Sequence, residues 1–164
     1  MDDSDLGFDE AAALVRLHDA ASAIVDGVEL CLPGWVIAAV DRLLDEWGRA
    51  STEQVAVARA AARDAGPVLA RRLGAELRAL FALDPSEQCA TPLQVVRGAV
   101  REPTEILGAA GVAPVRRDPF EARAFPEDRY GLVPEALGDL GDPDLSPLLL
   151  VWGMAKAAVL RSRA

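Results

Sequence analysis

The sequence has no asparagine, one lysine, one histidine and two cysteines among its 164 residues. Cys31 and Cys89 form no CxxC motif, and in a reduced compartment we expect both to be buried apolar thiols. No Glu-x-x-His or His-x-x-x-His pattern is present, so we expect no metal and no cofactor. Phosphate-cradling glycine loops and a Gly-x-Ser-x-Gly nucleophile turn are also missing. These absences favour a protein that is not an enzyme.

An export signal is missing as well. The first five residues include three aspartates, whereas an export signal begins with basic and then apolar residues. The longest uncharged apolar run, Leu148 to Ala155, has about a third of the length that a membrane span requires. We therefore expect a soluble cytoplasmic protein that does not act at a membrane.

The net charge of −9 is spread unevenly along the chain. Residues 1–50 hold eleven acids and three arginines, a net charge of −8, and residues 51–101 hold five acids and seven arginines, a net charge of +2. Either the acidic front packs beside the arginine-rich middle, or it presents an acidic face to a basic partner. Because an acidic protein has little attraction for phosphate backbones, we expect no nucleic-acid binding.

Apolar residues make up 51% of the chain and recur mostly at spacings of three and four, which predicts an all-α fold. In the first half the pattern predicts four helices, over residues 8–26, 33–47, 51–65 and 68–83. Gly27 and Gly48 are expected to end the first two helices, and Gly66-Pro67 is expected to break or bend the third. The run Ser51–Gln54 is a capping box, which predicts a helix start.

The second half is rich in proline, with nine of the eleven prolines between residues 85 and 147. Several prolines follow a residue with a capping oxygen, as helix starts do: Asp84-Pro85, Thr91-Pro92, Asp118-Pro119, Asp142-Pro143 and Ser146-Pro147. Short helices that begin at proline are therefore predicted, giving an irregular bundle of about seven helices. We expect one domain over residues 1–164, and a division near residues 84–91 is the alternative.

The last predicted helix runs from Pro147 to about Arg161. It opens with the sequence LLLVW at residues 148–152, which is apolar on all sides. A helix that is apolar all round is normally buried, so this one is predicted to pass through the centre of the fold.

The segment QVVRGAVREPTEILG, residues 94–108, comes closest to a functional site. Its apolar residues keep one helical phase across Pro103, which predicts a single kinked helix over residues 92–110 that stops at Gly111. Arg97 and Arg101 then lie one turn apart on one face, as either a solvated face with Glu105 nearby or an anion site. As an anion or acidic-partner site, the pair could also include the two arginines beyond the turn, Arg116 and Arg117.

Three other patterns have ordinary structural explanations. His18 lies at the edge of an apolar stripe, which is typical of a histidine at the boundary of the core. Asp41 and Asp45 are one turn apart, as on the solvated face of an amphipathic helix. The run LARRLGAELRAL, residues 69–80, has the composition of a helix-turn-helix segment, but its leucines keep register through Gly74, so no turn is expected there.

The run at residues 91–137, beginning TPLQVVRGAVREPTEILG, and the later WGMAKA at residues 152–157 resemble uncharacterised small helical proteins of high-GC Gram-positive bacteria. The resemblance covers less than half of the chain and implies a bacterial source without implying an activity.

Two hypotheses for the function remain. The first is a non-catalytic helical protein that acts through protein contacts, with another protein or by self-association. Its support is the uneven charge and the tryptophans Trp35, Trp47 and Trp152, which could anchor an interface if exposed or else pack in the core. The second is a binding protein or enzyme for a small anionic ligand, which would use arginines of the Arg97–Arg117 segment around a pocket between helices.

Overall fold

The computed structural model describes residues 3–47, 49–112 and 132–164. Every regular element in these ranges is helical, so the all-α prediction is confirmed for them. The α-helices are α1 (Asp3–Trp47), α2 (Thr52–Ala82), α3 (Pro92–Val96), α4 (Arg101–Ala109) and α6 (Leu145–Ser162). Turns of 3-10 helix lie at η1 (Pro85–Glu87), η2 (Arg97–Val100) and η3 (Leu137–Leu140). The expected arrangement of about seven helices is not confirmed, because the first half forms two long helices where four were predicted.

Helix α1 continues through Gly27, where a stop was predicted. Tertiary packing explains why a glycine is found there, because a Cβ atom at position 27 would collide with the side chain of Leu145 in α6. The glycine therefore serves a close helix contact and does not end the helix. Pro33 also lies inside α1, although it removes one backbone hydrogen bond. The buried stripe keeps its phase on both sides of these two residues: Leu17, Ile24, Val28, Val36, Val40 and Leu43.

Helix α2 likewise continues through Gly66-Pro67, so of the two predicted alternatives, a break or a bend, the break is wrong. Gly66 is buried against α1, and a Cβ atom there would lie 2.8 Å from the Cα of Pro33. The two helices therefore lie too close together at this position for a side chain, which explains the glycine. The predicted capping box is confirmed, since Gln54 N donates to Ser51 Oγ at 3.1 Å and Ser51 N donates to Gln54 Oε1 at 2.8 Å.

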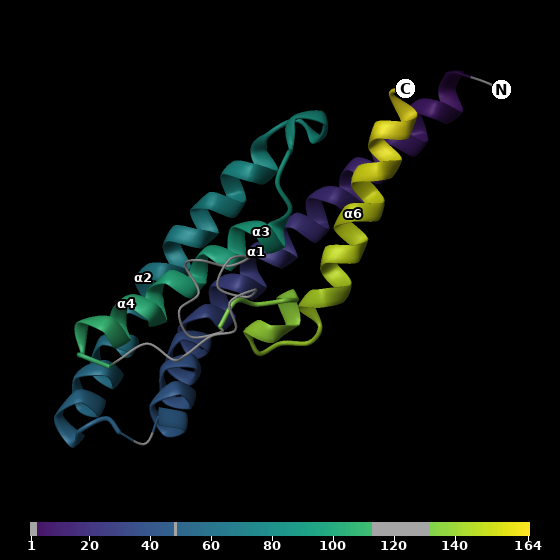
Figure 1. Cartoon of the computed structure of the whole chain (residues 1–164). Helices are drawn as coiled ribbons and strands as arrows, with labels where there is room; N and C mark the ends of the chain where they lie inside the picture. Colours follow the sequence, from purple (N-terminus) through teal and green to yellow (C-terminus); the bar gives the residue numbers. More distant parts are fainter. Residues whose placement is uncertain (1–2, 48, 113–131) are drawn as a thin grey trace, which may run out of the picture.

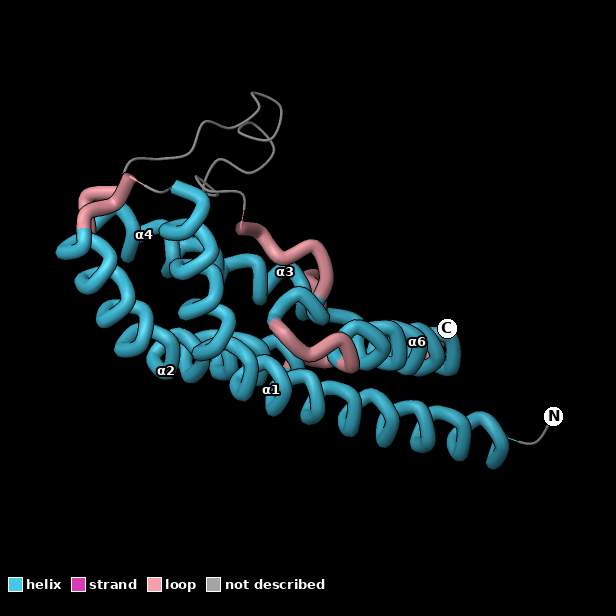
Figure 2. Tube along the Cα trace, turned by 90° about the horizontal axis from the view of Figure 1, so that it is seen from below, coloured by secondary structure: helices cyan, strands magenta, loops and turns pink. Residues whose placement is uncertain are grey.

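Helix α1 is the centre of the arrangement (Figures 1 and 2). Helix α2 runs back along one side of α1, and α3 and α4 lie against α2. Helix α6 lies along the N-terminal part of α1, contacts the C-terminal end of α2 through Trp152 and Phe81, and brings the C-terminus near the N-terminal end of α1 (Figure 1). One cluster of buried apolar residues includes members of all five α-helices.

The segment from α3 to α4 is one continuous helical rod, as predicted, with a change of helix type. The 3-10 turn η2 lies directly before Pro103, whose missing N–H cannot pair with the carbonyl of Ala99. The hydroxyl of Thr104 donates to the carbonyl of Val100 at 2.9 Å and so satisfies a neighbouring acceptor. The predicted stop at Gly111 is confirmed, because Gly111 has φ +79° and Val112 N donates to Leu107 O at 2.9 Å.

Helix α6 begins at Leu145, two residues before the predicted start. Ser146 is not its cap, because the Ser146 hydroxyl accepts a hydrogen bond from Gly138 N at 3.0 Å. The prediction that α6 passes through the centre of the fold is wrong. One side of the helix is buried, with Trp152 4% exposed, whereas Leu150 and Met154 on the other side are 66% and 64% exposed. In the described ranges α6 packs mainly on α1 and leaves its outer side uncovered.

Candidate functional site

The two arginines of the segment at residues 94–108 have different surroundings. Arg97 is half-buried, and its Nε donates to the carbonyl of Pro134 at 3.2 Å, whereas Arg101 is exposed. Arg97 therefore ties the chain after residue 131 to the helical rod. Arg116 and Arg117 lie outside the described residues. The anion site predicted from these four arginines remains a prediction.

A groove of about 450 Å³ lies beside Pro134, where the chain from Leu132 to Asp139 faces α1. Trp35 is half-buried and lines this groove together with Arg42. Trp152 is instead buried, with its ring 6.0 Å from the ring of Phe81. The side chain of Trp47 lies outside the described part. Trp35 therefore borders a groove, whereas Trp152 packs in the core.

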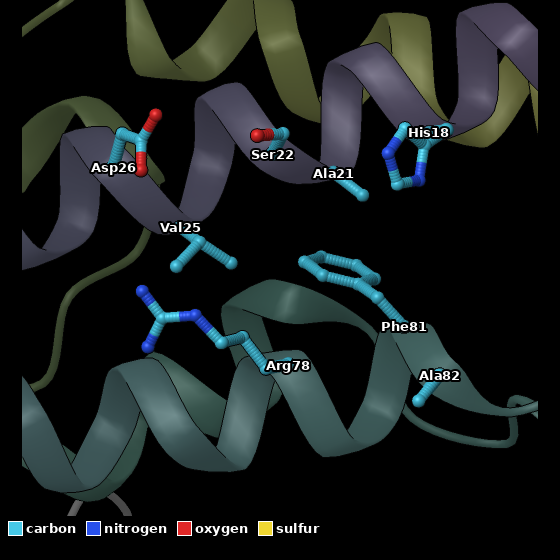
Figure 3. A pocket seen from close by; sticks show the side chains of 8 residues that line it. All are labelled: His18, Ala21, Ser22, Val25, Asp26, Arg78, Phe81 and Ala82. Atoms are coloured by element: carbon cyan, nitrogen blue, oxygen red, sulfur yellow. The ribbon is translucent and has the colours of Figure 1, made fainter.

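A second groove, of about 360 Å³, lies between α1 and α2 (Figure 3). Val25 and Phe81 give it an apolar floor, and His18, Asp26 and Arg78 stand around its rim (Figure 3). His18 is exposed, whereas a position at the edge of the core was predicted. The groove has the size and mixed lining of a site for a small molecule.

The groove does not hold a recognisable catalytic pair. His18, Ser22 and Asp26 follow one another at four-residue spacing on α1, with the serine in the middle. A serine nucleophile needs the histidine between the serine and the carboxylate, in hydrogen-bond contact with both. The Arg78 guanidinium donates to the Glu29 carboxylate at 2.7 Å, so its charge is already balanced. The groove can therefore hold a ligand, but its geometry suggests no reaction.

Charged side chains of α1 and α2 pair with each other. The Nε of Arg59 lies 2.7 Å from the Oδ1 of Asp41, and Arg78 forms a second ion pair with Glu29. Two arginines of the middle segment thus lie beside acids of the front segment, as expected if the charges balance within one fold. Within the described ranges no three histidine, cysteine or acidic side chains lie close enough together to hold a metal ion.

The two cysteines are not both buried, so that prediction is wrong. Cys89 is exposed in the connection between η1 and α3, and Cys31 is half-buried on α1. Burial raises the pKa of the Cys31 thiol, and the negative charge of Asp142 raises it further. A raised pKa disfavours the thiolate, so Cys31 is a poor nucleophile.

Arg163 links the C-terminal ends of α6 and α2 to the N-terminal part of α1. Its Nε donates to Glu10 on α1 at 2.7 Å, and its Nη1 lies 3.0 Å from a carboxylate oxygen of Asp84, just after α2. The pKa of Asp84 is lowered from 3.8 to about 2, first by the hydroxyl and N–H of Ser86 and then by Arg163. This cluster holds the C-terminal end of α6 in place.

The outward side of α6 carries several exposed apolar side chains close together. We call it the α6 outer face and define it by the exposed or half-buried apolar residues along one stripe between Pro147 and Arg161: Pro147, Leu150, Val151, Met154, Ala157 and Ala158. Ala157 and Ala158 are half-buried, and Ala158 also packs against the core at the edge of the stripe. They recur at spacings of three and four, so they form one stripe along about three turns. Lys156 is the one charged residue between the two ends, and it points inward to donate to the carbonyl of Gln88 at 2.6 Å.

A shallow groove of about 440 Å³ lies beside this stripe, where α6 borders α1. Arg16 of α1 lines one side, and Val151, Met154, Ala158 and other α6 residues line the rest. The groove is therefore apolar along its length, with the arginines Arg16 and Arg161 at its border.

Two helices are long and apolar enough to cross a membrane by length and composition alone. In the described ranges these are the Glu10–Asp45 part of α1, whose most apolar stretch of 18 residues has a mean hydropathy of 1.7, and α6, with a mean hydropathy of 1.2. Only 22% of α6 is buried inside the fold, compared with 39% of the most apolar stretch of 18 residues in α1. Core helices of soluble proteins meet the same criterion, so this finding does not place either helix in a bilayer.

No family profile matches the chain, and no curated protein or solved structure is significantly similar to it. The candidate site therefore rests on geometry.

Sequence reasoning did not identify the α6 outer face, although the signal was present. The run at residues 148–152 is apolar in every direction, and burial inside the fold is the usual explanation for such a helix. The other explanation, burial against something outside the fold, leaves the same sequence pattern. The groove around His18 left no signal, because its walls come from helices about 60 residues apart in sequence.

Proposed function

We propose that the chain is a non-catalytic cytoplasmic helical protein that acts through protein contacts, and that the α6 outer face is its contact surface. The observation that supports this proposal is the exposure of Leu150, Val151 and Met154, which are 66%, 44% and 64% exposed on one stripe. Scattered exposed apolar residues are ordinary, but an uncharged stripe along about three turns is typical of an interaction site.

A protein partner fits this face better than a lipid bilayer does. Helix α6 is held to the rest of the fold by Lys156, which bonds to Gln88 O, and by Arg163, which pairs with Glu10 and Asp84. Insertion of α6 into lipid would break these contacts or carry the charges with it, and buried charges are costly in hydrocarbon. A partner protein can cover the outer face without disturbing the inner one.

A photoreactive amino acid at position 154 tests the proposal in intact cells of the source organism. We expect light to join the protein covalently to a protein partner, seen as a discrete band of higher mass. The same amino acid at Val68, which is exposed on α2, is the matched control and is expected to give no such band. Equal or missing bands at both positions would mean that the α6 outer face is not a protein contact surface.

A small anionic ligand is the alternative function. The observations that favour it are the groove around His18, where Arg78 stays on the rim and has further N–H donors besides the one bonded to Glu29, and the position of Arg97 next to the groove at Pro134. A panel of phosphate and carboxylate compounds is then expected to raise the melting temperature. The effect should be lost on Arg78→Ala for the first groove, or on Arg97→Ala with Arg101→Ala for the arginine segment. No shift with any compound would rule this alternative out.

A further inference from the structure

Building on the proposed function, we infer that the occupant of the α6 outer face is a second copy of this chain, packed with its α6 antiparallel to the first. The two copies would be related by a twofold axis that passes near Met154. Such an interface is made of the same surface on both subunits, so a face that fits itself is required. Residue sizes and charges along α6 meet this requirement.

The sizes along the stripe are complementary in antiparallel order. The large exposed side chains, Leu150 and Val151, lie before Met154, and the small ones, Ala157 and Ala158, lie after it. With Met154 at the axis, Leu150 faces Ala158 of the second copy and Val151 faces Ala157. Large residues opposite small ones allow two helices to interdigitate at the usual separation of about 8–10 Å. A parallel pair would instead place Leu150 against Leu150.

The charges at the ends of the stripe favour the same direction. Arg161 and Arg16 lie at the C-terminal end of α6, and neither has an ion-pair partner among the described residues. Asp142 and Asp144 lie at the N-terminal end of α6, and Asp144 is exposed. Antiparallel packing brings the arginines of one copy toward the aspartates of the other. Parallel packing would bring like charges together at both ends, which is unfavourable.

The molar mass in solution tests the inference directly. We expect light scattering to give a mass that rises from 17.3 kDa toward twice this value as the concentration is raised. Met154→Asp places two carboxylates together at the axis and is expected to return the mass to that of one chain. Val68→Asp, an equally exposed apolar position on α2, is the matched control and should leave the dimer intact. Unchanged circular dichroism would show that both variants fold.

Cysteine pairs test the antiparallel order. In a Cys89→Ser background, which removes the exposed native thiol, Leu150→Cys mixed with Ala158→Cys is expected to form a disulfide-linked dimer on mild oxidation. Leu150→Cys alone is not expected to form a disulfide-linked dimer. Antiparallel packing holds the two copies of position 150 about 12 Å apart along the helix, from a rise of about 1.5 Å per residue. The reverse result would show parallel packing and contradict the inference.

Failure of this inference can be distinguished from failure of the proposed function. If the protein stays a monomer while position 154 is crosslinked to a different protein in cells, self-association is wrong and the contact surface stands. If the protein stays a monomer and binds phosphatidylcholine vesicles in a way that Met154→Asp abolishes, both proposals are wrong and the occupant is a membrane. A dimer that survives Met154→Asp would contradict the inference.

Discussion

At the scale of single residues, Asp84 makes stability depend on acidic pH. Its pKa is lowered from 3.8 to about 2, first through Ser86 and then through Arg163. A carboxyl with a lowered pKa in the folded state stabilises that state above its unfolded pKa, and loses this effect as the pH falls through the folded pKa. The stabilisation is therefore expected to disappear between about pH 4 and pH 2.

The substitution Asp84→Asn tests this effect. We expect the difference in the free energy of unfolding between wild type and variant to be constant above pH 5 and to shrink as the pH falls toward 2, in urea titrations. Asp64→Asn is a suitable control, since it removes an exposed carboxyl of α2 without affecting the Asp84 contacts. A difference that does not change with pH would show that the Asp84 contacts are not made in solution.

Residue-level signals predicted local structure well and long-range contacts poorly. The capping residues Ser51 and Gln54 and the stop at Gly111 act within a few neighbours, so their roles follow from the sequence around them. Arg97 could not be assigned in the same way, because its acceptor is a carbonyl 37 residues later in the chain. Side-chain spacing predicts which face a residue occupies but not what covers that face.

At the scale of elements, close packing explains why α1 and α2 continue through residues that usually end a helix. Local propensity predicts that Gly27 and Gly66-Pro67 interrupt the helices, and both helices nevertheless continue. Tertiary contacts outweigh these penalties, since Gly27 accommodates Leu145 and Gly66 accommodates Pro33. The helical periodicity was therefore a better guide to the fold than the helix-breaking residues.

The substitution Gly66→Ala tests the close contact. A Cβ atom at position 66 would lie 2.8 Å from the Cα of Pro33, and backbone cannot move aside cheaply. We expect a loss of about 1–3 kcal/mol in the free energy of unfolding. Gly34→Ala is the matched control, because nothing lies within 4 Å of its Cβ position, and a gain of about 0.5–1 kcal/mol is expected there. A stabilised Gly66→Ala variant would show that the helices lie further apart.

At the scale of the whole molecule, α6 is both part of the core and part of the surface. Its inner side is buried at Trp152, Ala155 and Val159, and the rest of the described chain leaves its outer side uncovered. The all-round apolar sequence thus predicted burial correctly on one side, and we propose that a second copy covers the other side. The sequence could not separate these cases, because apolar periodicity is the same whichever molecule provides the neighbour.

The most direct test of self-association through α6 is the melting temperature measured over a wide range of protein concentration. Association of folded chains stabilises them by mass action, so the melting temperature of the wild type is expected to rise with concentration. The melting temperature of Met154→Asp is expected to be lower at high concentration and independent of concentration throughout. A wild-type melting temperature that stays the same at every concentration, and equals that of Met154→Asp, would contradict the claim that the α6 outer face joins two copies of this chain.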